Sequence, residues 1–243
     1  MSYKDRSKQI CRYFKNEYYK LYEEQNRTSN PYFKDAIIKN YIYKGPILEW
    51  YMKIKLRLEG WYDTYDKLLP RKGLIVDLGC GYGAMSYMLS MLSSERQVWG
   101  IDYDDEKISV ANNAFLRNDR ISFTSGDIRA IELPEADAFV ISDVLHYIDR
   151  ESQRIVIKNC LSKLNKGGVL VIKDVDSTLN ERCNNTVKSE QWSTQIMKFN
   201  KIDGELCFLS REFVEQVVTD YGWQIQCVDN KSRLNNVIFV ITK

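Results

Sequence analysis

Residues 74–86, LIVDLGCGYGAMS, place one carboxylate and three glycines in a single short stretch. Asp77 lies near the end of the apolar run, and Gly79, Gly81 and Gly83 follow at every second position. Glycine-rich turns between a strand and a helix commonly bind phosphates through backbone N–H groups. A carboxylate two residues before the first glycine would repel a phosphate. The stretch therefore suits a ligand that is positively charged at this point.

S-adenosylmethionine is such a ligand, since it carries an ammonium group and a sulfonium and no phosphate. We expect Asp77 to hold its amino group. We expect Gly79, Cys80 and Gly81 to let the backbone approach the methionine part. The alternative is a nicotinamide dinucleotide site, because residues 79–84 formally satisfy GxGxxG/A, but that pattern alone is weak and Asp77 disfavours it.

Further acids follow later strands at the positions that this cofactor requires. Asp102, in WGIDYDD, lies 25 residues after Asp77, where a carboxylate can accept both ribose hydroxyls, and Tyr103 can pack on the adenine. Asp127, in SGDIR, can accept the adenine amino group, with Ile128 against the ring. The alternatives are a helix N-cap for Asp102 and a surface turn for Asp127.

The stretch ISDVLHYI places three polar side chains after the fourth apolar run, where open α/β sheets bind ligands. We expect Ser142 to contact the cofactor and Asp143 to orient the substrate or contact the cofactor. His146 is the candidate general base for a phenol or ring proton. The alternative for His146 is a histidine that only shapes the pocket.

Apolar runs rich in valine and isoleucine alternate with helical patterns, which predicts a parallel sheet covered on both faces. The predicted helices are 83–92, 104–116, 150–164 and 211–221, the last capped by Ser210. The predicted strands are 74–78, 97–101, 121–125, 137–142, 168–174, 223–229 and 236–242. The short polar loop between the last two predicts a hairpin, so the fold class is α/β: a Rossmann-like, doubly wound, seven-stranded sheet with the last strand antiparallel.

The first 70 residues have a different pattern, which predicts an N-terminal helical cap over the ligand edge of a domain spanning residues 71–243. Helices are expected over 6–25 and from Pro46 to Pro70. This segment holds 14 Lys/Arg against nine Asp/Glu and many tyrosines, including Tyr41 and Tyr43. Such a segment can bind RNA, acidic lipid headgroups or an acidic carrier protein, although a solvated helical face with its tyrosines packed inward is the simpler interpretation. Residues 176–205 are expected to form a lid or substrate loop.

Composition narrows the class of protein further. The net charge of +2 does not suggest a nucleic-acid partner, and no apolar run approaches the length of a membrane span. The N-terminus lacks a signal-peptide pattern, so we expect a cytoplasmic protein with free thiols. A single histidine and six scattered cysteines disfavour a Cys/His zinc site, and no metal is expected.

The segments VDLGCGYG, GIDYD, SGDI, ISDVLHYI and LNKGGVLVIKD, in this order, resemble class I S-adenosylmethionine-dependent methyltransferases over residues 73–243. Together with YIYKGPILEWYMKIKLRLE, residues 40–243 resemble methyltransferase modules of Bacteroidetes associated with aryl polyene pigment clusters of the flexirubin type. The resemblance implies methyl transfer to a phenolic or polyene acceptor, free or bound to a carrier, with S-adenosylhomocysteine as the product.

Two other functions remain open from the sequence. One is an RNA or protein methyltransferase, which the basic N-terminus favours and the absence of an NPPY-type tetrapeptide disfavours. The other is a partner protein that binds the cofactor without turnover. The acceptor atom, the use of a general base and the oligomeric state are not specified by the sequence.

Overall fold

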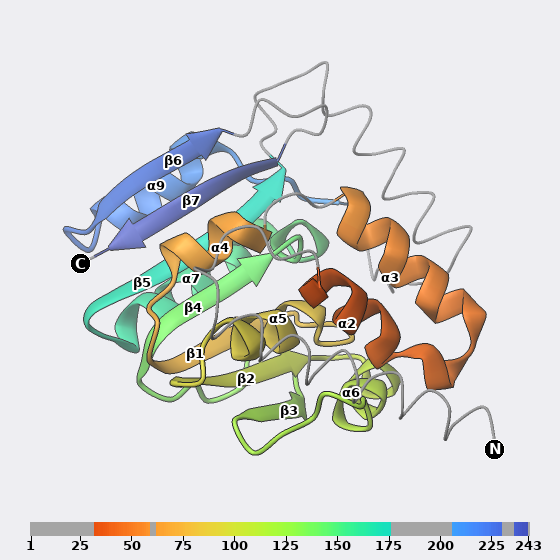
Figure 1. The fold of residues 1–243 in the computed structure, drawn as a ribbon. Helices are drawn as coiled ribbons and strands as arrows, with labels where there is room; N and C mark the ends of the chain where they lie inside the picture. The colour runs from red at the N-terminus through yellow and green to blue at the C-terminus, as the bar shows by residue number, and fades with distance from the viewer. Residues whose placement is uncertain (1–31, 59–61, 176–205, 230–235, 243) are drawn as a thin grey trace, which may run out of the picture. The chain divides into compact units, whose positions relative to one another are not determined.

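The computed structural model describes residues 32–58, 62–175, 206–229 and 236–242. The chain divides into two compact units, one ending at Gly126 and one beginning at Asp127. Seven strands form one sheet in the order β3-β2-β1-β4-β5-β7-β6 (Figure 1). The predicted sheet, with its last strand reversed, is confirmed.

The strands of the first unit are parallel, and β1 (Gly73–Leu78) pairs with β2 (Arg96–Asp102) along its whole length. β3 (Ile121–Ser125) pairs with β2. The register pairs Asp77 with Gly100 and Asp102 with Ser125. Both acids therefore lie at the carboxyl ends of their strands, the edge at which parallel α/β sheets bind ligands.

Two helices of the first unit begin immediately after these strands. α5 (Ala84–Leu92) starts at Gly83, whose φ of +78° is left-handed. α6 (Asp105–Asn112) is capped by Asp104, whose carboxylate accepts hydrogen bonds from the backbone N–H groups of Glu106 and Lys107. The cap on this helix is thus Asp104, which leaves Asp102 for another role.

The described part of the N-terminal segment is helical. It contains α2 (Tyr32–Asn40), the 3-10 turn η1 (Ile42–Lys44), α3 (Pro46–Leu58) and α4 (Tyr62–Leu68). α2 packs on α5, and buried side chains on α2 and α3 supply the apolar contact. The helix expected over 6–25 lies outside the described residues, as do residues 59–61 inside the long helix expected from Pro46.

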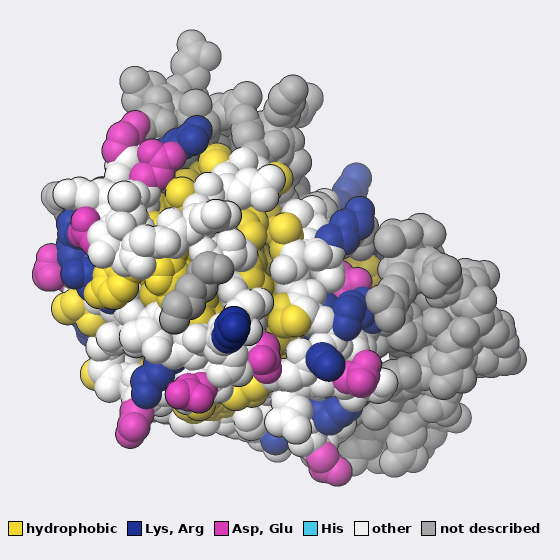
Figure 2. Space-filling model, turned by 90° about the vertical axis from the view of Figure 1, so that its left-hand side faces the viewer, with side chains coloured by type: hydrophobic (Ala, Val, Ile, Leu, Met, Phe, Trp, Pro, Cys, Tyr) yellow, Lys and Arg dark blue, Asp and Glu magenta, His cyan; other side chains and the backbone are white. Residues whose placement is uncertain are grey.

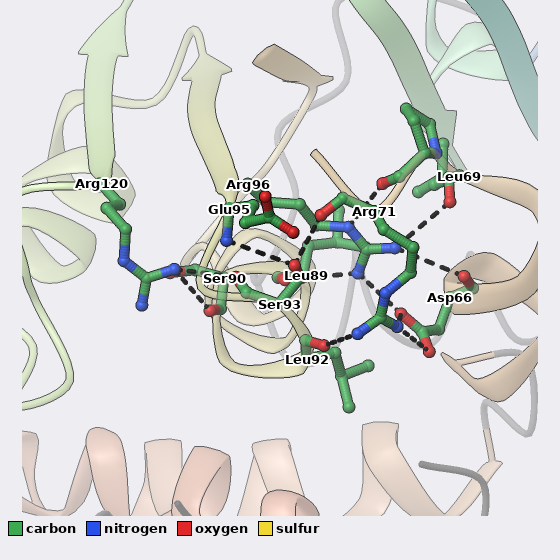
Figure 3. Close-up of polar contacts among 11 residues, drawn as sticks. Asp66, Leu69, Arg71, Leu89, Ser90, Leu92, Ser93, Glu95, Arg96 and Arg120 are labelled. Carbon is green, nitrogen blue, oxygen red and sulfur yellow. Dashed lines mark hydrogen bonds and ion pairs between the residues drawn. The ribbon is translucent and has the colours of Figure 1, made fainter. Parts of the chain in front are cut away.

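A buried arginine ties α4 to the sheet of the same unit. Arg96, at the start of β2, has no exposed surface, and its guanidinium lies 2.7 Å from the carboxylate of Asp66 on α4. It also donates to the carbonyls of Asp66, Leu69, Pro70 and Leu89, while Arg71 adds a second ion pair to Asp66 (Figure 3). This shared carboxylate satisfies two cations that would otherwise be costly to bury.

The second unit holds the remaining four strands. β4 (Ala136–Ser142) is parallel to β5 (Leu164–Val175), which is antiparallel to β7 (Asn236–Thr242), and β7 pairs with β6 (Gln224–Asp229). The turn η2 (Leu145–Tyr147) and the helix α7 (Arg150–Ser162) follow β4, and α9 (Arg211–Thr219) precedes β6. Ser210 caps α9 as predicted, accepting from the N–H of Phe213.

Several predicted boundaries were wrong by a few residues. β5 begins at Leu164 rather than 168, because the pairing with β4 continues across an irregularity between Ala136 and Ala138. α6 ends at Asn112 rather than 116. The amide of Asn112 bonds to the carbonyl of Phe123, and that of Asn113 bonds back to Ser109, so polar side chains end the helix.

Candidate functional site

The glycine loop connects β1 to α5 in a conformation that glycine favours. Gly79, Gly81 and Gly83 have φ values of +76°, +55° and +78°. The N–H groups of Gly79 and Cys80 both donate to the carbonyl of Ile101, at 2.7 and 2.9 Å, which fixes the loop to β2. The loop is therefore a rigid backbone surface at the sheet edge.

The individual glycines serve different purposes. A Cβ at Gly83 would lie 2.5 Å from the ring of Phe123, so packing requires this glycine. A Cβ at Gly81 would meet no protein atom within 4 Å. Gly81 thus combines a left-handed φ with an open outer face, as expected for a backbone that a ligand approaches.

Asp77 is a buried carboxylate, 2% exposed, beside this loop. Its Oδ2 accepts a hydrogen bond of 2.6 Å from the hydroxyl of Ser86 on α5. Burial raises the pKa of Asp77 to about 6, an effect that the Ser86 hydrogen bond opposes and the nearby Asp102 increases. A cation bound at this point would relieve the cost of desolvating the ionised form. The site therefore fits the ammonium group of S-adenosylmethionine.

Asp102 is held in place by two backbone groups. Its Oδ2 accepts from the N–H of Gly81 at 2.8 Å, and its Oδ1 accepts from the N–H of Asp104 at 3.0 Å. Each oxygen keeps a further lone pair, so the oriented carboxylate can still accept both hydroxyls of a ribose. Tyr103 beside it is 51% exposed, which leaves its ring accessible for stacking.

The thiol of Cys80 is buried and is influenced by the charges of both acids. Burial, followed by the charges of Asp77 and Asp102, raises the pKa of the Cys80 thiol well above its ordinary value. The group stays a neutral thiol at physiological pH and contributes bulk rather than charge. Its sulfur would lie 2.9 Å from a Cβ at Gly100, so Gly100 makes room for it.

The N-terminal helices contact the glycine loop directly within the first unit. Tyr41 has no exposed surface, and its hydroxyl donates to the carbonyl of Tyr82, between Gly81 and Gly83, at 2.7 Å. The ring of Tyr82 also lies edge-on to those of Tyr41 and Tyr51. The buried Tyr41 therefore acts in core packing and in fixing the loop.

Asp127, in the second unit, is paired with a neighbouring arginine. The guanidinium of Arg129 lies 2.5 to 2.9 Å from both carboxylate oxygens, and this hydrogen bonding lowers the pKa of Asp127. An adenine amino group would share the carboxylate with Arg129. Ile128 is buried, at 8% exposed, and Asp127 is partly exposed.

The end of β5 holds the loop that follows β4. Lys173 Nζ lies 2.5 Å from Asp143 Oδ2, and the hydroxyl of Ser142 donates to the same oxygen at 3.4 Å. Asp174 Oδ1 lies 2.6 Å from His146 Nδ1, and Asp174 Oδ2 accepts from the backbone N–H of His146. Both members of this second pair are buried.

His146 is therefore an oriented imidazole. A carboxylate at Nδ1 favours the tautomer that carries its proton there, which leaves the lone pair on Nε2. The ring packs against Tyr147, at 4.1 Å between centroids, and Phe208, at 5.8 Å. This geometry can accept a proton at Nε2 and stabilise the resulting cation through Asp174.

The structure groups the predicted residues by unit. The first unit brings together the residues expected at the methionine and ribose parts: Asp77, Gly79, Cys80, Gly81, Asp102 and Tyr103. The second unit holds Asp127, Ile128, Ser142, Asp143 and His146. Sequence reasoning missed Lys173 and Asp174, whose signal is a charged pair at the end of an otherwise apolar strand.

Among the described residues, no helix is long and apolar enough to cross a membrane. That same part of the chain contains no group of three His, Cys, Asp or Glu side chains that could hold a metal ion.

Comparison with known proteins shows similarity to S-adenosylmethionine-dependent enzymes. Residues 75–168 match a family described as "Methyltransferase domain". A carboxy-S-adenosyl-L-methionine synthase of Campylobacter curvus is 25% identical over 151 residues, which cover 58% of this chain and 64% of that protein. A probable S-adenosyl-L-methionine-dependent methyltransferase, TehB, of Haemophilus influenzae is 29% identical over 143 residues, 54% of this chain and 49% of that protein. The chain thus spans about half to two thirds of the length of these curated relatives.

A solved structure supports the same fold. Human N-acetylserotonin methyltransferase in complex with S-adenosylmethionine aligns with a TM-score of 0.60 at 16% identity, over 96% of this chain and 66% of that one. The fold is that of the class I S-adenosylmethionine-dependent methyltransferases. Within that fold, residues 75–168 are the part that is similar to a methyltransferase domain.

Proposed function

We propose that the chain binds S-adenosylmethionine and transfers its methyl group to a small-molecule acceptor. The acceptor is a phenol or aryl polyene, free or bound to a carrier protein. The observation that carries the proposal is the pairing of a buried Asp77 with an oriented Asp102 on either side of the glycine loop. The match of residues 75–168 to a methyltransferase domain supports it.

Each residue has a defined part in holding the cofactor. Asp77 takes the ammonium group, and Asp102 takes the two ribose hydroxyls. The backbone at Gly79, Cys80 and Gly81 would hold the methionine part. The order of the sequence motifs is the basis for assigning Tyr103, Asp127, Ile128 and Ser142 to the adenine side. The cofactor supplies an already activated methyl group, so the protein has to align the acceptor with it and exclude water.

His146 is the proposed general base for a phenolic acceptor. Asp174 fixes the ring, so Nε2 would accept the proton of a phenol hydroxyl. The imidazolium formed is stabilised by the buried carboxylate of Asp174. General bases of this kind contribute roughly 10²- to 10⁴-fold in rate.

The helical segment within residues 1–70 is proposed to act as a cap on the domain of residues 71–243. The contact of Tyr41 with the Tyr82 carbonyl supports this role, since a segment that holds the cofactor loop is coupled to cofactor binding. On the face in Figure 2, Lys and Arg side chains are interspersed with Asp and Glu. The coloured part of this face therefore shows no continuous basic patch of the kind that typifies nucleic-acid-binding surfaces.

The test is transfer of radiolabelled methyl from S-adenosylmethionine to catechol and to 4-hydroxycinnamic acid, with tRNA and casein as alternative acceptors. The proposal expects labelled phenol ethers, lost in Asp102→Ala and retained in Asp119→Asn, an exposed acid of the same unit. Label in tRNA or casein alone would favour the macromolecular function. Binding of S-adenosylhomocysteine with no transfer to any acceptor would favour the non-catalytic partner.

A second candidate comes from the relatives named as carboxy-S-adenosyl-L-methionine synthases. In that case the chain would modify S-adenosylmethionine itself rather than a separate acceptor. Mass spectrometry of the cofactor recovered after incubation with cell extract distinguishes the two. A cofactor that has gained a carboxyl group would replace the proposed methyl transfer, and unmodified cofactor would leave it in place.

A further inference from the structure

Asp143 has an unusual backbone. Its φ of +57° makes it the one non-glycine residue with a left-handed φ in the part of the chain that the structure describes. Aspartate tolerates this region better than most residues, but it still requires support from its surroundings. Residues held in such conformations occur preferentially where the orientation of a side chain matters for function.

Lys173 provides that support at both ends of the residue. Its backbone carbonyl accepts from the N–H of Asp143 at 2.9 Å, and its Nζ lies 2.5 Å from Asp143 Oδ2. The register pairs Ser142 with Lys173, so the backbone hydrogen bond from Asp143 to Lys173 extends the β4–β5 ladder by one residue. Lys173 and Asp143 thus form a clamp at the carboxyl end of the sheet.

The burial of the two charges is unequal. The side chain of Lys173 is 2% exposed, whereas that of Asp143 is 22% exposed. A buried ammonium group depends on its carboxylate partner, whereas a partly exposed carboxylate can still contact a ligand. Because Oδ2 is used by Lys173 and Ser142, Oδ1 is the oxygen available for that contact.

The neighbouring residue holds the candidate base in the same way. Successive side chains of a strand point to opposite faces, so Lys173 and Asp174 reach different residues of the loop after β4. Asp174 fixes His146, and Lys173 fixes Asp143. One dipeptide therefore orients the side chains of both Asp143 and His146.

We propose that Lys173 is a positioning residue that holds Asp143 to accept a hydrogen bond from the methyl acceptor. This inference rests on the proposed methyl transfer and deepens it. It names the acceptor class as a molecule with a hydroxyl or amine donor beside the methylated group. A carboxylate at that point would be repelled by Asp143.

The experiment compares Lys173→Met and Lys173→Arg with wild type, using catechol as the acceptor because it carries a second hydroxyl. Lys173→Met is expected to lower kcat/KM for catechol at least tenfold while the Kd of S-adenosylhomocysteine stays within twofold. Lys173→Arg, which keeps the charge, is expected to recover most of the loss. Arg211→Met, which removes an exposed ion pair on α9, is the matched control and should change neither value.

Melting temperatures test the clamp without turnover. Asp143→Asn is expected to lower the melting temperature because it leaves Lys173 buried without its carboxylate, and adding Lys173→Met is expected to restore it. Unchanged catechol kinetics in Lys173→Met would overturn the inference, as would a Kd for S-adenosylhomocysteine that weakens in step with kcat/KM. Wild type that binds neither S-adenosylhomocysteine nor catechol would instead overturn the proposed function, with the melting comparison still reporting on the clamp. Binding of S-adenosylhomocysteine without methylation of catechol would overturn the named acceptor class.

Discussion

Asp77→Asn is predicted to stabilise the ligand-free protein while it weakens cofactor binding. The pKa of this carboxyl is raised from 3.8 to about 6, mainly because it is buried. Below a pH of about 3.8 it is protonated in both the folded and the unfolded chain and contributes nothing. Between the two pKa values the unfolded chain releases the proton more readily, so stability falls as pH rises. Above pH 6 the full cost is present.

The size of this cost follows from the difference of about two pKa units. At 1.36 kcal/mol per unit, the ionised Asp77 lowers the free energy of unfolding by about 3 kcal/mol at pH 7.5. Asparagine has a similar shape and can still accept the hydrogen bond from Ser86, but it carries no charge. For a chain of this size the gain corresponds to a melting temperature higher by roughly 6–12 °C.

Thermal unfolding between pH 4 and pH 8 measures this difference, with Asp119→Asn as an exposed control. The gap between Asp77→Asn and wild type should be small near pH 4 and grow to its full value above pH 6. Calorimetry should show at least tenfold weaker binding of S-adenosylhomocysteine, because the ammonium group loses its carboxylate. A variant no more stable than wild type at pH 7.5, or a gap that does not change with pH, would refute the reasoning.

Three further substitutions test other parts of the site. Asp174→Asn should lower kcat roughly 100-fold. It should also reduce the population of the Nδ1–H tautomer of His146, which ¹⁵N NMR of the sole histidine measures. An unchanged tautomer population would contradict the proposed orientation of His146 by Asp174. Tyr41→Phe, which removes the hydrogen bond to the Tyr82 carbonyl, should weaken S-adenosylhomocysteine binding roughly twofold to tenfold by calorimetry. An unchanged affinity would show that the N-terminal segment does not influence cofactor binding through this hydrogen bond. Arg96→Met should lower the free energy of unfolding by about 3 kcal/mol in urea titrations, and a loss below about 1 kcal/mol would show that its ion pair contributes little.

Most of the sheet could be predicted because each strand has a recognisable residue pattern within its own short segment. Runs such as LIVDL and NVIFVIT are apolar, short and rich in β-branched residues, which is typical of strands buried on both faces. The glycine loop was equally readable, since Gly79 and Gly81 have left-handed backbones that few other residues adopt. These features depend on residues close together in the sequence.

The polar pairs could not be predicted because they depend on contacts between distant elements. Asp174 meets His146 across 28 residues, and Arg96 meets Asp66 across 30. Each pair is fixed by the register of a strand and the angle of a helix, which single-sequence patterns do not give. The lid expected over 176–205 lies outside the described residues and stays a prediction.

The most direct test of the account is calorimetric titration of the full chain with S-adenosylhomocysteine, the demethylated product of the proposed reaction. The account predicts binding with a micromolar Kd that Asp102→Ala weakens at least tenfold, because the substitution removes both the ribose contact and the bond to Gly81. Absence of binding, or equal binding by Asp102→Ala, would contradict the claim that the glycine loop and its acids form a cofactor site.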